Sequence, residues 1–243
     1  MSVCSLPNPL RVEATAALRI GGFVPCSTQD WPDQLAAVVF IAGCPWRCGY
    51  CHNPHLQTGR GDEALHWADL LPQLVARKTL LDGVVFSGGE PTLDRYLPEA
   101  LHDLRAAGMA NGLHTAGCYP HRLARVLPLL DWVGLDIKAL PGGYDAITGV
   151  PDSGHRAWTS LGLVQSAGID YEVRVTAHPD WLSEATLDQL LEQLAAASVP
   201  HIALQAARLA GPAGDPVGDR ARYPLSALSR WARDIPGLVL RGF

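Results

Sequence analysis

Residues 35–53, LAAVVFIAGCPWRCGYCHN, carry the features that decide the fold and the chemistry of this chain. The first seven, residues 35–41, form an apolar run of the length of a buried β-strand. The loop that follows places Cys44, Cys48 and Cys51 in a C-x3-C-x2-C pattern. Thiolates this close together are typical ligands of zinc, copper(I) or an iron–sulfur cluster. Three cysteines without a fourth nearby leave one metal position open, which is typical of catalytic rather than structural metal sites.

The cysteine loop resembles that of the radical S-adenosylmethionine (SAM) enzymes, whose C-x3-C-x-aromatic-C motif has Tyr50 at its aromatic position. Its extension into His52 and Asn53 is similar to the activases of glycyl-radical enzymes, such as the pyruvate formate-lyase activating enzymes. The segments 30–32 (DWP) and 87–92 (SGGEPT) match the same family. The resemblance is strongest to the longer activating proteins of anaerobic ribonucleoside-triphosphate reductase, and it runs from about Gly21 to Gln205.

This resemblance implies two cofactors, one [4Fe–4S] cluster held by Cys44, Cys48 and Cys51, and SAM bound at the open iron. It also implies reductive cleavage of SAM and formation of a glycyl radical on a partner enzyme, with anaerobic ribonucleotide reductase as the expected partner. Flavodoxin or ferredoxin is the electron donor expected from the family. The segment after Cys51 contains no further cysteine before residue 63, so no second cluster is expected.

The composition fits one α/β domain that buries a full core, since 48% of the 243 residues are hydrophobic. We expect a single domain over residues 17–243, preceded by a tail, residues 1–16, that is poorly ordered. A net charge of -5 without a basic stripe argues against nucleic acid as a partner. No apolar stretch approaches the roughly 20 residues that cross a bilayer. The N-terminus lacks a signal-peptide pattern, so we expect a cytoplasmic protein without a membrane partner.

Strand-length apolar runs alternate with helical patterns, which predicts βαβ units and a parallel sheet. Six such units match the open, partial (β/α)6 barrel of the resembled family, with the cluster at the C-terminal ends of the strands. The strands are expected at 35–41, 83–87, 110–115, 132–138, 170–176 and 200–205. The helices are expected near 63–79, 94–107, 120–130, 155–167, 183–197 and 223–234. Two long loops, 140–153 and 208–222, are expected to be functional or mobile.

The alternation of side chains along the strands predicts where the polar groups gather. Asp136 and Lys138 share one face of their strand, and Glu172 and Arg174 share one face of the next. A parallel sheet covered on both sides is continuously hydrophobic, so this polar face indicates a ligand-filled interior, the alternative being a half-exposed sheet. Only two of the 19 basic residues are lysines, which favours a specific use for Lys138 over an accident of composition. Arg174 is otherwise explained by a partner such as Glu172.

The family resemblance assigns roles to these and other residues. Gly88, Gly89 and Glu90 are expected to receive the amino group of SAM, although alone they would indicate a turn. The catalytic set, with the three cysteines, includes Lys138 and Arg174. The remaining cofactor-binding candidates are Tyr50, His114, Asp136 and Gln205.

Each of these candidates has a specific expectation attached to it. Asp136 and Lys138 are assigned to the carboxylate and ribose of SAM, and Gln205 to the adenine side. Tyr50 packs on the adenine or fills core. His114 stands where similar activases have Asp, so a neutral histidine replaces an acidic cation or ribose contact. His52 is expected to pair with a cluster sulfur, to meet the partner protein, or to be an ordinary surface or core group.

Three other functions remain open from the sequence. The partner can be another glycyl-radical enzyme, of the pyruvate formate-lyase type. The same radical chemistry can act on a small molecule, as in deazapurine or cofactor synthesis. Alternatively, the three cysteines and His52 form a structural zinc knuckle, although the usual paired C-x2-C spacing is missing. Cys4, Cys26 and Cys118 lie far apart in the sequence and are interpreted as incidental thiols.

Overall fold

The computed structural model describes residues 18–207 and 223–243, which form one eight-stranded sheet in the order β1 to β8. The strands are β1 (Ile20–Ser27), β2 (Ala36–Ile41), β3 (Gly83–Gly88), β4 (Ala110–Thr115), β5 (Trp132–Asp136), β6 (Asp170–Ala177), β7 (Ile202–Ala206) and β8 (Leu238–Arg241). Strands β2 to β8 are parallel, and β1 is antiparallel to β2. The predicted open α/β architecture is confirmed, and its six strands correspond to β2 to β7.

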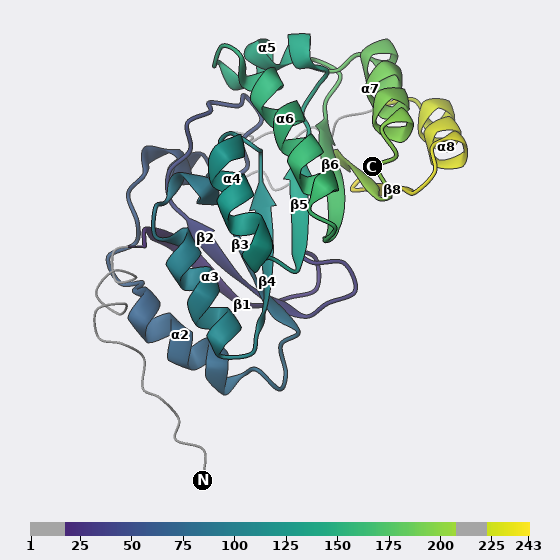
Figure 1. Cartoon of the computed structure of the whole chain (residues 1–243). Coiled ribbons are helices and arrows are strands. Elements are labelled where there is room, and N and C mark those ends of the chain that lie inside the picture. The colour runs from purple at the N-terminus through teal and green to yellow at the C-terminus, as the bar shows by residue number, and fades with distance from the viewer. Residues whose placement is uncertain (1–17, 208–222) are drawn as a thin grey trace.

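The helices follow the strands as expected for βαβ units. They are α2 (Trp67–Ala76), α3 (Leu97–Ala106), α4 (Pro120–Val126), α5 (Tyr144–Thr148), α6 (Ser153–Ser166), α7 (Glu184–Ala196) and α8 (Leu225–Asp234). Short 3-10 turns lie at η1 (Pro54–Thr58), η2 (Pro91–Leu93), η3 (Leu127–Leu129) and η4 (Pro141–Gly143). Figure 1 shows α3, α4 and α6 side by side on one face of the sheet. No helix of the described residues is long and apolar enough to cross a membrane.

Three elements differ from the sequence prediction. Strands β1 and β8 at the two edges of the sheet were not predicted. The loop 140–153 is not an unstructured connection, because it contains η4 and α5. The predicted tail, residues 1–16, and the second long loop, 208–222, lie outside the described residues, so those two expectations stay predictions.

The inner face of the sheet is closed at the start of the strands by Trp31, from the β1–β2 connection. Trp31 packs on a small apolar cluster of the inner face and stacks on Trp132, with ring centroids 5.6 Å apart. A Cβ atom at Gly83 or Gly112 would lie 2.8 to 2.9 Å from the Trp31 ring, so these positions must lack side chains for the ring to fit. Aromatic rings therefore fill the inner face at the N-terminal ends of the strands, and the C-terminal ends remain available for polar side chains.

Candidate active site

One cavity of about 260 Å³ lies at the C-terminal ends of the strands, where the fold places functional groups. It contains all the predicted site residues except Glu90. Its lining comprises Asp30, Phe40, Cys44, Trp46, Cys48, Tyr50, Cys51, His52, Asn53, Gln57, Ser87, Gly88, Gly89, His114, Thr115, Ala116, Asp136, Lys138, Arg174, Thr176 and Gln205. The structure therefore brings together three parts: the thiols of the three cysteines, the turn that contains Gly88 and Gly89, and a row of charged side chains from Asp136, Lys138 and Arg174.

The three cysteines form the thiol wall on the loop that leaves β2. The Cys51 N–H donates to the Cys48 carbonyl (3.1 Å), and the Arg47 guanidinium donates to the Cys44 carbonyl (2.7 Å). A third bond ties the loop to α5, since the Arg47 N–H donates to the Thr148 carbonyl (2.8 Å). These bonds to main-chain carbonyls shape the loop, and the three cysteines line the cavity.

Burial makes the free thiols poor acids in this loop. It raises the pKa of the Cys44 thiol to about 12 and also raises the pKa of the Cys48 thiol. A bound metal reverses this preference because its charge stabilises a coordinating thiolate, so metal binding here releases protons.

The donor set fits an iron–sulfur cluster better than a single zinc ion. Within the described residues, no three His, Cys, Asp or Glu side chains converge as ligands of one metal ion. A cluster needs no such convergence, because each thiolate binds a different iron. Two buried polar atoms in the cavity lining, Trp46 Nε1 and the Tyr50 hydroxyl, also make no hydrogen bond in the described structure, which suits a cavity shaped for a bound group.

The glycine turn at the end of β3 packs directly against the cysteine loop. The Gly89 N–H donates to the Ile41 carbonyl (2.9 Å), and the Glu90 N–H donates to the Gly43 carbonyl (2.8 Å). A Cβ at Gly88 or Gly89 would lie 2.3 Å from one of these two carbonyl oxygens, and Gly88 has a φ of +123°. Only glycine fits at both positions, because backbone meets backbone there.

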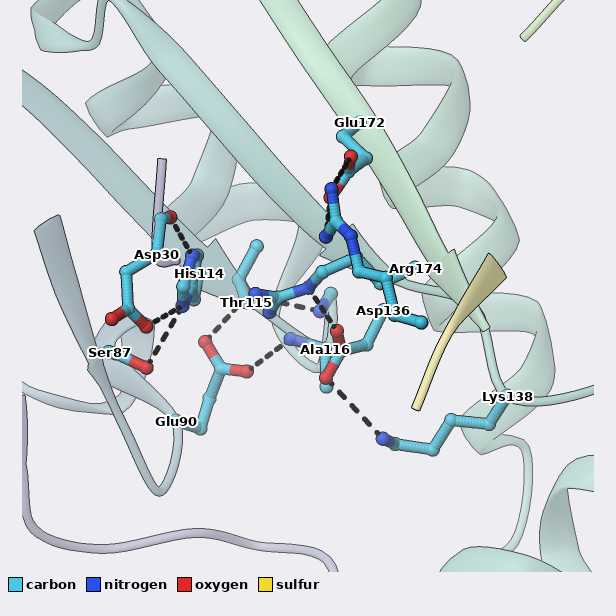
Figure 2. Close-up of polar contacts among 12 residues, drawn as sticks. Asp30, Ser87, Glu90, His114, Thr115, Ala116, Asp136, Lys138, Glu172 and Arg174 are labelled. Carbon is cyan, nitrogen blue, oxygen red and sulfur yellow. Dashed lines mark hydrogen bonds and ion pairs between the residues drawn. The ribbon is translucent and has the colours of Figure 1, made fainter. Parts of the chain in front are cut away.

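Glu90 is fully buried and does not line the cavity. Its Oε1 accepts from the Thr92 N–H (3.1 Å), the Thr92 hydroxyl (2.5 Å) and the Thr115 hydroxyl (2.7 Å). Its Oε2 accepts from the Ala116 N–H (2.9 Å), as Figure 2 shows. The carboxylate therefore joins the ends of β3 and β4, and a direct contact to an amino group stays a prediction.

A row of three charged side chains, Asp136, Lys138 and Arg174, also lines the cavity. Arg174 Nε lies 2.9 Å from Asp136 Oδ1, and Lys138 Nζ lies 3.6 Å from Asp136 Oδ2 (Figure 2). Burial alone would raise the pKa of Asp136, but Arg174 and Lys138 hold it below its usual value. Burial would likewise lower the pKa of Lys138, but Tyr50 and other acidic neighbours hold it well above its usual value. The row therefore carries one negative and two positive charges.

The alternative explanation of Arg174, a pairing with Glu172, is wrong, because Arg174 pairs with Asp136. Asp136 and Arg174 are register partners on β5 and β6, which brings their side chains together. Glu172 is instead held by Arg241 of the unpredicted strand β8, through two bonds of 2.8 and 2.7 Å. The predicted sharing of one polar face by Asp136 and Lys138 is confirmed, since both line the cavity.

His114 forms a neutral part of the cavity wall. Its Nε2–H donates to the Asp30 carbonyl (2.6 Å), a tautomer assigned from the acceptor, and Nδ1 accepts from the Ser87 hydroxyl (3.2 Å). Burial, together with the positive charge of Arg174, lowers the pKa of His114 to about 3. The Asp30 carboxylate, 4.0 Å from Nδ1, therefore makes no ion pair with this neutral ring. The sequence predicts a neutral histidine at position 114, and the lowered pKa agrees with this prediction.

The cavity also contains residues that were not predicted as site residues. Asp30 and Ser87 hold His114, and both belong to segments that the sequence resemblance singled out as motifs without assigning them a contact. Thr176 lies on the same strand face as Arg174, as strand alternation predicts, but it was not assigned a role in the site. Asn53 belongs to the extension of the cysteine motif, which was not given a contact in the site, and Gln57 carries no comparable signal.

Comparison with known proteins agrees with this geometry. A sequence profile described as Radical SAM superfamily matches residues 38–194. A candidate glycyl-radical enzyme activating enzyme of Methanocaldococcus jannaschii is 27% identical over 70% of this chain and 73% of its own length. The pyruvate formate-lyase-activating enzyme of Clostridium pasteurianum is 36% identical over 58% of this chain and 60% of its own length. The crystal structure of a radical SAM methyltransferase from Sphaerobacter thermophilus shares the fold, with a TM-score of 0.61 at 16% identity over 97% of this chain and 82% of that one.

Proposed function

The chain belongs to the radical SAM superfamily, whose enzymes use a [4Fe–4S] cluster and SAM, and we propose that it generates a glycyl radical on a partner enzyme. The observation that carries this proposal is the shared cavity. Cys44, Cys48 and Cys51 line the same space as Gly88 and Gly89, so a cluster and a sulfonium ligand can be held side by side.

The residues of the cavity divide the binding work between them. The thiolates of Cys44, Cys48 and Cys51 would hold the cluster, which would supply the electron for the reductive cleavage of SAM. Gly88 and Gly89 line the cavity beside the thiols, and we assign the amino group of SAM to this turn.

The charged row and its neighbours receive the other end of SAM. Lys138 and Arg174 attract the carboxylate, while Asp136 keeps both cations in place and can accept from a ribose hydroxyl. Tyr50 and Gln205 also line the cavity, and we assign them to the adenine of SAM. His114 contributes a fixed, uncharged wall because both of its ring nitrogens already have partners.

The partner enzyme is the finer part of the proposal. Anaerobic ribonucleotide reductase is the partner suggested by the sequence resemblance, whereas the similarity to the Clostridium pasteurianum activating enzyme supports a pyruvate formate-lyase type of partner about as well. Flavodoxin or ferredoxin would deliver the electron.

The test starts from protein reconstituted without oxygen. Wild type should bind about four irons per chain and cleave SAM when reduced. The Cys48→Ala variant should lose both properties, whereas Cys26→Ala, which removes an exposed thiol of β1 outside the cavity, should keep both. A glycyl radical signal in electron paramagnetic resonance, measured after mixing with each partner in turn, then distinguishes the two partners. If Cys48→Ala still cleaves SAM, or if neither partner acquires a radical, the proposal fails.

A further inference from the structure

Three arginines surround a second cavity, of about 250 Å³, on the outer side of the turn that follows β3. They are Arg95, just before α3, and Arg122 and Arg125 of α4; we call them the arginine surface. None of the three forms an ion pair within the described residues. The acidic residue of the lining, Asp94, is already held by Arg19 Nε (3.0 Å). This cavity is therefore positively charged in a protein whose net charge is -5.

Two of the guanidinium groups are held in place by aromatic rings. The Arg95 guanidinium lies 4.7 Å from the centre of the Tyr96 ring, and Arg122 lies 4.7 Å from that of Tyr119. Stacking of this kind orients the planar cation, whose N–H groups suit carboxylates. Arginine and tyrosine are also the residues enriched in the energetic centres of protein interfaces.

The arginine surface connects to the active site through the turn between them. Arg122 donates to the carbonyls of Leu93 (2.7 Å) and Thr92 (3.3 Å). Thr92 in turn binds Glu90, and the preceding residue, Gly89, packs against the cysteine loop. The arginine surface is thus joined to the cysteine loop by the contacts of the turn between them.

We propose that the arginine surface docks an acidic one-electron carrier protein, an inference that rests on the proposed radical SAM function. In this complex the carrier is oxidised by one electron and the cluster is reduced by one, with no bond made or broken. The carrier fits this place better than the glycyl-radical enzyme does, because a target glycine must enter the SAM cavity, whereas a carrier only has to approach the cluster from outside. Opposite charge accelerates such encounters and makes their rate sensitive to salt.

The test is the double variant Arg95→Glu/Arg125→Glu, which leaves Arg122 and its bonds to the turn intact. Neither side chain holds a main-chain group in the described structure. The matched control, Lys78→Glu/Arg156→Glu, reverses two exposed charges outside the cavity. With reduced flavodoxin as donor, SAM cleavage by the double variant should slow by at least about 10-fold, and the control should stay within about 2-fold. Wild type should also slow as salt rises from about 50 to about 300 mM.

Dithionite as electron donor separates this inference from the proposed function. Wild type, the double variant and the control variant should all cleave SAM equally fast with dithionite, because this small reductant needs no docking surface. The inference is overturned if SAM cleavage by the double variant is equally slow with both donors, or if it is slow with neither. It is also overturned if the double variant is impaired only in glycyl radical formation with dithionite, since this last result would assign the arginine surface to the glycyl-radical enzyme. Donor-dependent SAM cleavage without any glycyl radical in wild type would overturn the proposed function and leave the docking surface standing.

Discussion

Replacing Glu90 by glutamine separates a role in holding the structure together from a role in binding SAM. The glutamine amide would place an NH₂ group opposite the Ala116 N–H, where the carboxylate now accepts a bond of 2.9 Å. Turning the amide over places the NH₂ against the Thr92 N–H instead, so one main-chain donor loses its acceptor either way.

The magnitude follows from these contacts. A buried donor left without an acceptor costs about 1–3 kcal/mol, and the remaining bonds to Oε1 weaken by some tenths of a kcal/mol each because the acceptor is no longer charged. We therefore expect Glu90→Gln to lower the free energy of unfolding by about 2–4 kcal/mol in protein without cluster or SAM. Urea unfolding, followed by the fluorescence of the seven tryptophans, measures this change.

A matched control variant tests whether the loss of stability is specific to the buried position of Glu90. Glu192→Gln makes the same change at an exposed position of α7 and should alter the free energy of unfolding by less than about 0.5 kcal/mol. If Glu90→Gln is as stable as this control but binds SAM weakly, Glu90 serves as a ligand of the amino group, and our interpretation of its contacts is wrong.

Three further predictions concern other parts of the site and its supports. Gly89→Ala should lower both the free energy of unfolding and the iron content, because the new Cβ meets a main-chain oxygen. Its control, Gly162→Ala, lies at an open helix position and should raise the free energy of unfolding by about 0.5–1 kcal/mol. Urea unfolding and iron analysis measure both effects. His114 has a lowered pKa in the folded state, so the unfolded chain binds its proton first as the pH falls; from pH 6.5 to pH 5, wild type should lose up to about 2 kcal/mol more stability than His114→Gln. Arg241→Leu leaves the buried Glu172 carboxylate unpaired and should cost about 2 kcal/mol in urea unfolding, a value reduced from that of a fully buried pair because Arg241 is partly exposed; an unchanged midpoint would contradict the role of β8.

The apolar runs in the sequence were sufficient to predict the central strands but not the edges of the sheet. Strand β1 contains two glycines and a proline and is half-exposed, so it lacks a continuous apolar signal. Strand β8 has only four residues, too few for a recognisable pattern. Both edges depend on pairing with a strand already in place, which is a tertiary effect.

The residues of the site were predicted better than their contacts. The motif and the strand alternation identified Asp136 and Arg174 as members of the cavity, but only the register of β5 and β6 makes them partners. Glu172 lies on the same strand as Arg174, two residues away, yet its partner comes from β8. The orientation of Glu90 depends on Thr115, 25 positions away, which no local pattern reveals.

The two main-chain bonds between the glycine turn and the cysteine loop have a consequence for how such a protein can change over time. In the proposed function, these bonds would set the spacing between the cluster and SAM through main-chain atoms alone. Most substitutions around the rim are therefore free to alter which proteins are recognised while the electron-transfer distance stays constant. A scaffold built this way can acquire new partners without rebuilding its reaction centre.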